Sequence, residues 1–183
     1  LPLSSSRDLD PLIERIGDAR YVLLEEASYG TSEYYVWRQR ISERLIPEKG
    51  FSFIAVEGDW PDCYRGNRYV KGYDGAGRTA EEVVRGFERW PTCMWANREV
   101  VGLAEFLREE NNGRPQDRRV GFYGLDVYSL WDSLHQVIAW LRENQPQSLP
   151  AALEAFRCFE PHEDAQEYAR ASAWLPDSCE QQV

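Results

Sequence analysis

Histidine is scarce in this sequence, since the 183 residues include only two, His135 and His162. His135 lies at the edge of an apolar stripe on an expected helix, and His162 lies in an acidic loop, so we expect neither to be a catalytic base. The four cysteines are far apart and form no CxxC pair. Their spacing argues against a zinc cluster and indicates reduced thiols, as in a cytoplasmic protein.

The sequence also lacks the short motifs of common catalytic and cofactor sites. It contains no GxSxG, HExxH, P-loop or GxGxxG. We therefore expect no bound metal and no cofactor. No apolar run approaches the ~20 residues of a transmembrane helix, so a membrane protein is not expected.

Positive charge is in short supply as well. Lysine and arginine number 21 against 31 aspartates and glutamates, which gives a net charge of −10. Nucleic acids and anionic membranes both select basic surfaces, so neither is an expected partner. Hydrophobic residues make up 43% of the chain, which is typical of a globular domain with a sizeable core.

Apolar runs alternate with helix-capping signals along the chain. The expected strands are 21–25, 51–57 and 119–123. The expected helices are 11–16, 32–49, from 60 to about 72, from 80 to about 89, 96–111 and 130–143, with two short helices after a linker at 145–150. This alternation predicts an α/β fold with a mainly parallel sheet and flanking helices.

Acidic residues stand where the expected strands end. Glu26 follows the first strand, Glu57 ends the second, and Asp126 follows the third. Because parallel strands present their carboxyl ends at one edge of a sheet, we expect the three carboxylates to meet there. Arg38 lies early in the next helix, and its side chain leans back toward that edge. It can pair with Glu26 or Glu57, although a solvated helix arginine would carry the same sequence signal.

Other residues near this edge allow two interpretations. The acids at strand ends can accept hydrogen bonds from helix N-termini, and for Asp59 and Asp126 helix capping is the simpler explanation. The aromatic residues Trp60, Tyr64, Trp90 and Trp95 can wall a pocket for a bulky ligand or pack in the core. We include Asp59, Trp60, Tyr64 and Asp126 as candidate substrate-pocket residues.

Three stretches resemble the erythromycin esterase family: the segment from LLEEASYGTSE to NRYVKG, then WPTCMWANREV, and then VGFYGLDVYSL. The resemblance runs from about Leu9 to at least Glu163. It implies that residues 1–183 are the N-terminal portion of a single α/β domain whose second half follows in the family. It also implies metal-independent hydrolysis of a macrolactone ester by an activated water, in a response to antibiotics.

The resemblance assigns the candidate catalytic positions. Glu26 matches the glutamate of a G-E-x-x-H-G pattern, Arg38 the site arginine and Glu57 a second glutamate. Tyr29 stands at the position of the catalytic histidine, and Glu25 at the position of the first glycine. A phenol is only ~0.1% ionised at pH 7, so Tyr29 donates a hydrogen bond but is a poor base.

Three functions remain open at this point. The first is an esterase-type hydrolase acting on a small-molecule, macrolide-like ester, impaired by Tyr29 and by the absent second half. The second is a non-catalytic ligand-binding pseudoenzyme or a relic fragment. The third is a hydrolase in which Glu26 and Glu57 share acid and base roles. In each case an incomplete sheet would leave an exposed edge and an apolar face, which predicts self-association.

Overall fold

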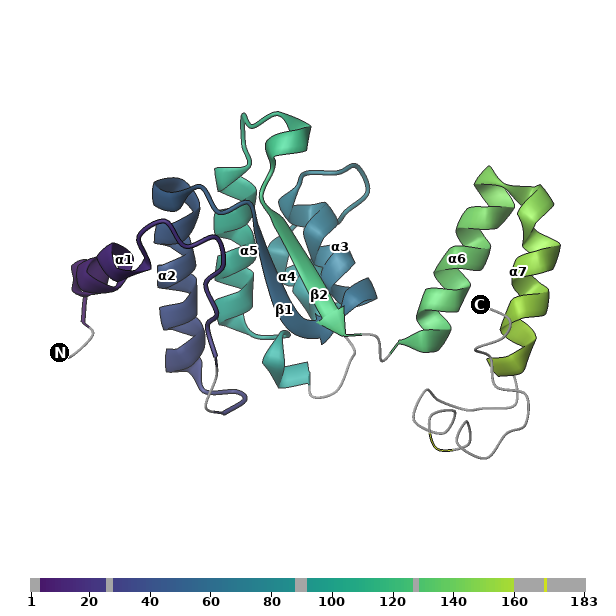
Figure 1. Cartoon of the computed structure of the whole chain (residues 1–183), viewed down its shortest axis with the longest axis horizontal. Coiled ribbons are helices and arrows are strands. Elements are labelled where there is room, and N and C mark those ends of the chain that lie inside the picture. Colours follow the sequence, from purple (N-terminus) through teal and green to yellow (C-terminus); the bar gives the residue numbers. More distant parts are fainter. Residues whose placement is uncertain (1–3, 26–27, 88–91, 127–128, 160–169, 171–183) are drawn as a thin grey trace. The chain divides into compact units, whose positions relative to one another are not determined.

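The computed structural model describes residues 4–25, 28–87, 92–126, 129–159 and 170. The chain forms two compact units, Leu1–Leu125 and Asp126–Val183. Figure 1 shows the elements of each unit along the chain. None of the described helices is long and apolar enough to span a membrane.

The first unit contains five α-helices and both strands within its described part. In order these are η1 (Ser6–Leu9), α1 (Asp10–Ile16), α2 (Ser32–Lys49), β1 (Phe53–Asp59), α3 (Trp60–Val70), α4 (Ala80–Arg85), η2 (Thr92–Met94), α5 (Arg98–Glu110), η3 (Gln116–Arg118) and β2 (Gly121–Asp126). The strands β1 and β2 pair in parallel, as the two arrows of Figure 1 show. The α/β fold with flanking helices is thus confirmed.

Local sequence signals set several helix boundaries. Gly50 ends α2 with φ of 74°, a left-handed conformation that glycine adopts without strain. The Thr79 side chain caps α4 by accepting from the Glu82 N–H at 3.1 Å. The Asn97 side chain caps α5 by accepting from the Val100 N–H at 2.9 Å.

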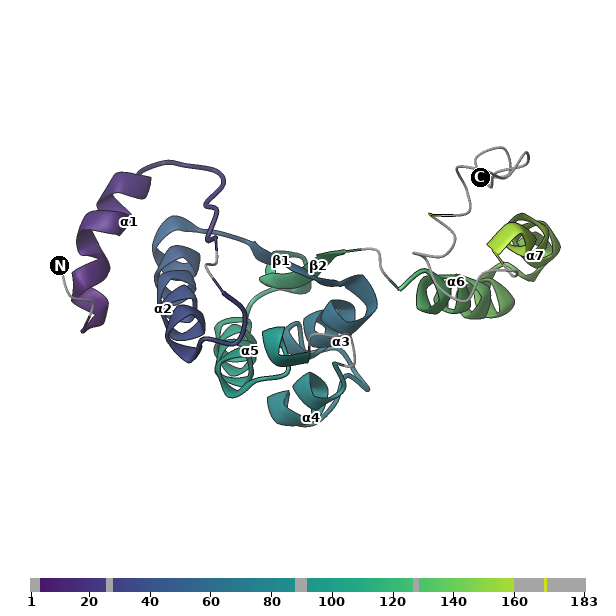
Figure 2. The ribbon, with the colours of Figure 1, turned by 90° about the horizontal axis from the view of Figure 1, so that it is seen from below.

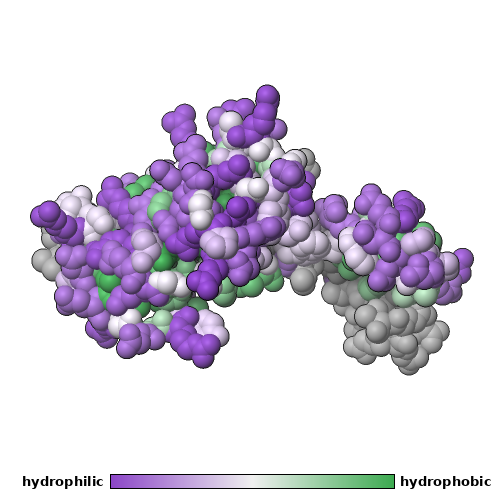
Figure 3. Space-filling view, turned by 90° about the horizontal axis from the view of Figure 1, so that it is seen from above, coloured by the Kyte–Doolittle hydropathy of each residue, from purple (hydrophilic) through white to green (hydrophobic). Residues whose placement is uncertain are grey.

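The core lies on one side of the two-stranded sheet. Figure 2 shows α3, α4 and α5 beneath the strands, and the main cluster of buried side chains joins these helices to the sheet. Its members include Val70, Val83, Leu107, Val120 and Phe122. The other face of the sheet carries exposed side chains, among them Phe53, Tyr123 and Leu125. Seen from above, hydrophobic side chains emerge between the charged ones on this unit (Figure 3).

Two buried asparagines satisfy the backbone of β2 on the edge away from β1. Successive residues of a strand direct their peptide groups to opposite edges, and the Gly121 N–H donates to the Ser52 carbonyl on the β1 side. On the opposite edge, Asn111 accepts from the Val120 N–H at 2.6 Å and donates to the Val120 carbonyl at 2.9 Å. Asn67 accepts from the Phe122 N–H at 3.0 Å. These side chains replace a neighbouring strand there.

All three expected strands need correction. Residues 21–25, which the structure describes, belong to no strand. The prediction from their apolar run was wrong because Leu23 is 93% exposed and Tyr21 75% exposed, so the run is not buried on both faces. The second strand is shifted toward the C-terminus and ends at Asp59 rather than at Glu57. The third is shifted in the same direction and runs from Gly121 to Asp126 rather than over 119–123.

The second unit contains two described α-helices, α6 (Leu130–Asn144) and α7 (Leu149–Phe156), flanked by η4 (Pro146–Ser148) and η5 (Arg157–Phe159). Leu134 and Phe159 are buried together, with Leu130, Trp131 and Phe156 packed against them. His135 is exposed on α6. His162 and most of the chain beyond Phe159 lie outside the described residues.

Candidate functional site

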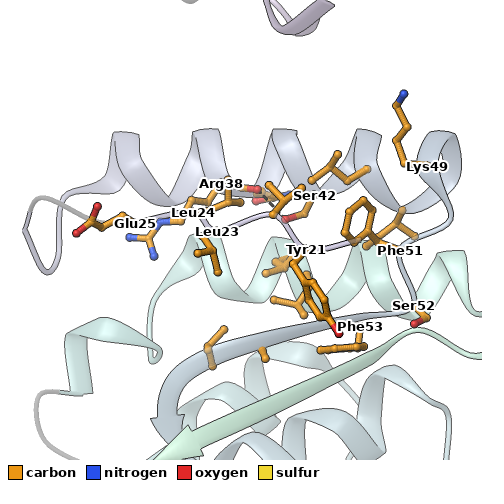
Figure 4. A pocket seen from close by; sticks show the side chains of 18 of the residues that line it. Tyr21, Leu23, Leu24, Glu25, Arg38, Ser42, Lys49, Phe51, Ser52 and Phe53 are labelled. Carbon is orange, nitrogen blue, oxygen red and sulfur yellow. Dashed lines mark hydrogen bonds between the residues drawn. The ribbon is translucent and has the colours of Figure 1, made fainter. Parts of the chain in front are cut away.

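An open groove of about 1360 Å³ lies within the first unit. Its walls are the segment 17–25, helix α2, strand β1 and the first turns of α5 (Figure 4). Most of its lining is apolar, including Val22, Leu24, Ile54, Val56 and Leu103. The groove can therefore hold a large, mainly apolar molecule and bring it to the few polar groups on its walls.

Three of the four candidate catalytic residues, Tyr29, Arg38 and Glu57, line this one groove. They come from a turn, a helix and a strand, which are separate elements of the first unit. Glu26, the fourth, lies outside the described residues. The separation of Glu26 and Glu57, on which a two-carboxylate mechanism depends, therefore stays a prediction.

Arg38 faces the groove from the first half of α2. Its guanidinium carbon lies 4.9 Å from the centre of the Tyr35 ring, which is one turn nearer the helix N-terminus. This is the backward lean that helical geometry dictates for a long side chain. Figure 4 shows Arg38 and Glu25 at the same end of the groove. The ring of Tyr35, itself buried, limits the positions that the guanidinium can take.

Glu57 projects from β1 on the exposed face of the sheet. Its backbone carbonyl accepts a 2.7 Å hydrogen bond from Nε1 of Trp95. The next residue is Gly58, and a Cβ at that position would lie 3.1 Å from the same nitrogen. Glycine at this position therefore lets the indole approach the strand closely.

Tyr29 belongs to the turn that leads into α2. The Ser28 and Thr31 hydroxyls are hydrogen-bonded to each other at 2.8 Å across this turn. Gly30 has φ of 74°, a conformation that disfavours any larger residue. Tyr29 is 54% exposed and lines the groove.

The four candidate pocket residues do not line this groove. Asp59 is buried at the N-cap position of α3, but its side chain makes no capping hydrogen bond. Trp60 and Tyr64 pack on each other with ring centres 6.2 Å apart on α3. Asp126 is the last residue of β2. None of the four therefore belongs to the lining of the groove.

Helix α2 also carries an ion pair at the end of the groove opposite Arg38. Glu48 lines the groove, and Arg44 donates to its two carboxylate oxygens at 2.6 and 3.0 Å. This pair lowers the pKa of Glu48 below its usual value, so the carboxylate stays ionised. Arg44 also donates to Asp10 at 2.5 Å, which ties α1 to α2. Among the described residues, no group of three or more histidine, cysteine and acidic side chains is arranged to hold a metal.

Sequence reasoning missed two groove residues. Tyr35 supports Arg38, and its position three residues before the arginine is the only signal that indicates this. Glu99 accepts a hydrogen bond from the Ser32 hydroxyl and joins α5 to the start of α2. Nothing in the local sequence links Ser32 to Glu99, because the two residues are 67 positions apart.

The solved structures that resemble this chain are larger proteins. A succinoglycan biosynthesis protein is 26% identical, with a TM-score of 0.71 over 92% of this chain and 41% of that one. A protein from Bacillus cereus is 23% identical, with a TM-score of 0.68 over 95% of this chain and 40% of that one. The chain thus spans about two fifths of the length of these relatives, and at the lower identity the likeness concerns the fold alone.

A comparison with family models gives a second result. The model described as erythromycin esterase matches residues 46–183. The match includes Glu57, Asp59 and the second resembling stretch, and it begins after Tyr29 and Arg38. Because the matched range is well over half of the 183 residues, this chain belongs to the erythromycin esterase family.

Proposed function

We propose that the groove is an ester-hydrolysing site of the erythromycin esterase type, and that this chain hydrolyses esters only weakly. The observation that carries the proposal is that Tyr29, Arg38 and Glu57 line the same groove. The resemblance to the family assigns these three residues to its site, with tyrosine in place of the histidine base. The apolar walls suit a bulky ester such as a macrolide, whose inactivation is an antibiotic response.

The residues divide the chemistry as follows. The Glu57 carboxylate takes a proton from a water, which then attacks the ester carbonyl. The Arg38 guanidinium stabilises the negative oxygen of the tetrahedral intermediate. The Tyr29 hydroxyl donates a hydrogen bond to the same oxygen but cannot replace a histidine as base. When the intermediate collapses, the ester C–O bond breaks and the Glu57 carboxyl returns its proton to the leaving alkoxide, which departs as the alcohol. A carboxylate is a weaker base than an imidazole, and general-base assistance contributes on the order of 10² to 10⁴ in rate, so weak turnover is expected.

A hydrolysis assay with two glutamate variants tests this proposal. The purified chain is incubated with nitrophenyl esters and with a macrolide. Glu57→Gln removes the proposed base, while Glu48→Gln changes a glutamate at the other end of the groove. We expect slow hydrolysis by the native chain, at least tenfold less with Glu57→Gln and no loss with Glu48→Gln. Equal loss in the two variants, or turnover typical of an intact enzyme at about 10 s⁻¹, would contradict the proposal.

A second candidate function is ligand binding without turnover. The apolar lining of the groove favours it, together with a tyrosine at the base position. Titration calorimetry with a macrolide separates the two proposals. Binding that Leu24→Asp weakens, with no ester cleaved by any variant, supports a binding protein. Measurable cleavage that depends on Glu57 supports the hydrolase.

A further inference from the structure

We infer that Trp95 is a positioning residue of the groove, which fixes the placement of Glu57 relative to Arg38. The inference rests on the proposed function, because it concerns two residues of that site. Trp95 lies in the segment before α5, outside the elements that carry Glu57 and Arg38. It contacts both of these elements through different parts of its side chain.

The indole N–H acts on the strand. Ser52 accepts from β2 through its carbonyl, so by strand alternation the Glu57 carbonyl faces the opposite edge of β1. The described residues place no strand on that edge. Instead, Nε1 of Trp95 donates to the Glu57 carbonyl at 2.7 Å. The indole thus takes the role of a neighbouring strand at the residue whose side chain the proposed reaction needs.

The ring of Trp95 acts on the helix. Its centre lies 6.3 Å from that of Tyr35, edge to face at 84°. Tyr35 in turn lies beneath the guanidinium of Arg38 at 4.9 Å. A continuous series of contacts therefore runs from the Glu57 backbone, through Trp95 and Tyr35, to Arg38.

Several contacts hold Trp95 in place. Its ring packs edge to face on Phe122 of β2, with centres 6.0 Å apart. The Thr92 carbonyl accepts a hydrogen bond from the backbone N–H of Trp95 at 3.2 Å. Asn97 donates to the carbonyls of Cys93 and Met94 at 3.0 and 3.1 Å, which closes the turn around Trp95. A residue held on several sides can transmit its position to the groups that it contacts.

The test uses Trp95→Phe, which keeps an aromatic ring for Tyr35 and Phe122 but removes the N–H donor. Trp37→Phe is the matched control, since Trp37 packs in a different cluster near α1 and lies beneath Arg40. Nuclear magnetic resonance follows the indole N–H signals and the Glu57 carbonyl. We expect the Trp95 indole N–H to exchange at least tenfold more slowly than that of the exposed Trp140. The Glu57 carbonyl and Arg38 guanidinium signals should shift in Trp95→Phe and stay unchanged in Trp37→Phe.

Hydrolysis kinetics supply the second measurement. We expect Trp95→Phe to lower kcat about tenfold with KM nearly unchanged, because misplacing a reacting group slows chemistry more than binding. Two results would overturn the inference regardless of the kinetics. One is rapid exchange of the Trp95 indole N–H. The other is Glu57 and Arg38 signals that do not shift in Trp95→Phe. If no variant cleaves an ester, the proposed hydrolase fails, and the resonance measurements alone decide whether Trp95 positions the two residues.

Discussion

Asn111 offers a direct test of how the edge of β2 is held. The residue is only 3% exposed. Its side chain donates to the Val70 carbonyl at 2.8 Å and makes both hydrogen bonds to Val120. It thereby joins the ends of α3 and α5 to the start of β2. The replacement Asn111→Ala removes all three bonds and leaves the Val70 carbonyl and both Val120 groups buried without this partner.

The expected loss follows from these three groups. Leaving a buried donor or acceptor unsatisfied costs about 1–3 kcal/mol. At the low end of that range, Asn111→Ala lowers the free energy of unfolding by about 3 kcal/mol. A domain of this size has a total of only about 5–15 kcal/mol, so the variant loses a large share of its stability.

Urea unfolding followed by circular dichroism and tryptophan fluorescence measures this loss. With a slope of about 1–3 kcal/mol per molar urea, the midpoint should fall by roughly 1–3 M. Asn112→Ala is the control, because Asn112 is the exposed neighbour of Asn111 and should change the free energy by less than about 0.5 kcal/mol. If Asn111→Ala unfolds within that same margin, the side chain does not hold the strand as described.

Three further results are expected. Backbone and hydroxyl hydrogen bonds from Ser4 and Ser5 lower the pKa of Asp8 to about 2 from 3.8. The contribution of Asp8 to stability is therefore full above pH 3.8 and is lost as the pH falls through about 2. An Asp8 carboxyl resonance that titrates instead near 3.8 would contradict this. In Arg44→Gln the pKa of Glu48 should rise toward its ordinary value, and a titration that leaves it unchanged would show that Arg44 is not the cause of the shift. The exposed Leu23 and Leu125 should favour self-association in sedimentation at rising concentration, and Leu125→Asp should reduce it; a monomer at every concentration would refute this.

The helices were largely predictable from local signals. Gly50, Thr79 and Asp59-Trp60-Pro61 mark helix ends or beginnings through backbone conformation and capping, and these depend on only a few neighbouring residues. The start of α2 at Ser32 and its end at Lys49 agree with the sequence analysis. Such boundaries need no knowledge of the tertiary fold.

The structure of residues 21–25 was not predictable in the same way. A short apolar run fits a buried strand, but a strand also needs a hydrogen-bonded neighbour, which the run itself does not specify. In the structure Val22 packs with the cluster around Leu45, while Leu23 points away from any core. The sequence indicates that the segment is extended, but it does not reveal its pairing.

The candidate site also combines features that the sequence predicts with features that it does not. The order of helix and strand alone assigned Arg38 and Glu57 to one site, and both residues line the same groove. Trp95 was among the aromatic residues that could wall a pocket, and it lines the groove. Its hydrogen bond to Glu57 could not be predicted, because it joins residues 38 positions apart. Trp90 lies outside the described residues. Asp59 and Trp60 were grouped with the site because they lie just beyond the expected strand end at Glu57, yet neither lines the groove.

The central claim is that this groove is an esterase-type site that lacks its base at Tyr29. The most direct measurement compares ester hydrolysis by Tyr29→His and Tyr29→Phe with that of the native chain. A histidine is mostly neutral at pH 7 and can accept a proton, so Tyr29→His should raise kcat/KM at least tenfold, with a pH profile that rises near pH 6.5. Tyr29→Phe should not raise it. Equal rates in the two variants would contradict the claim.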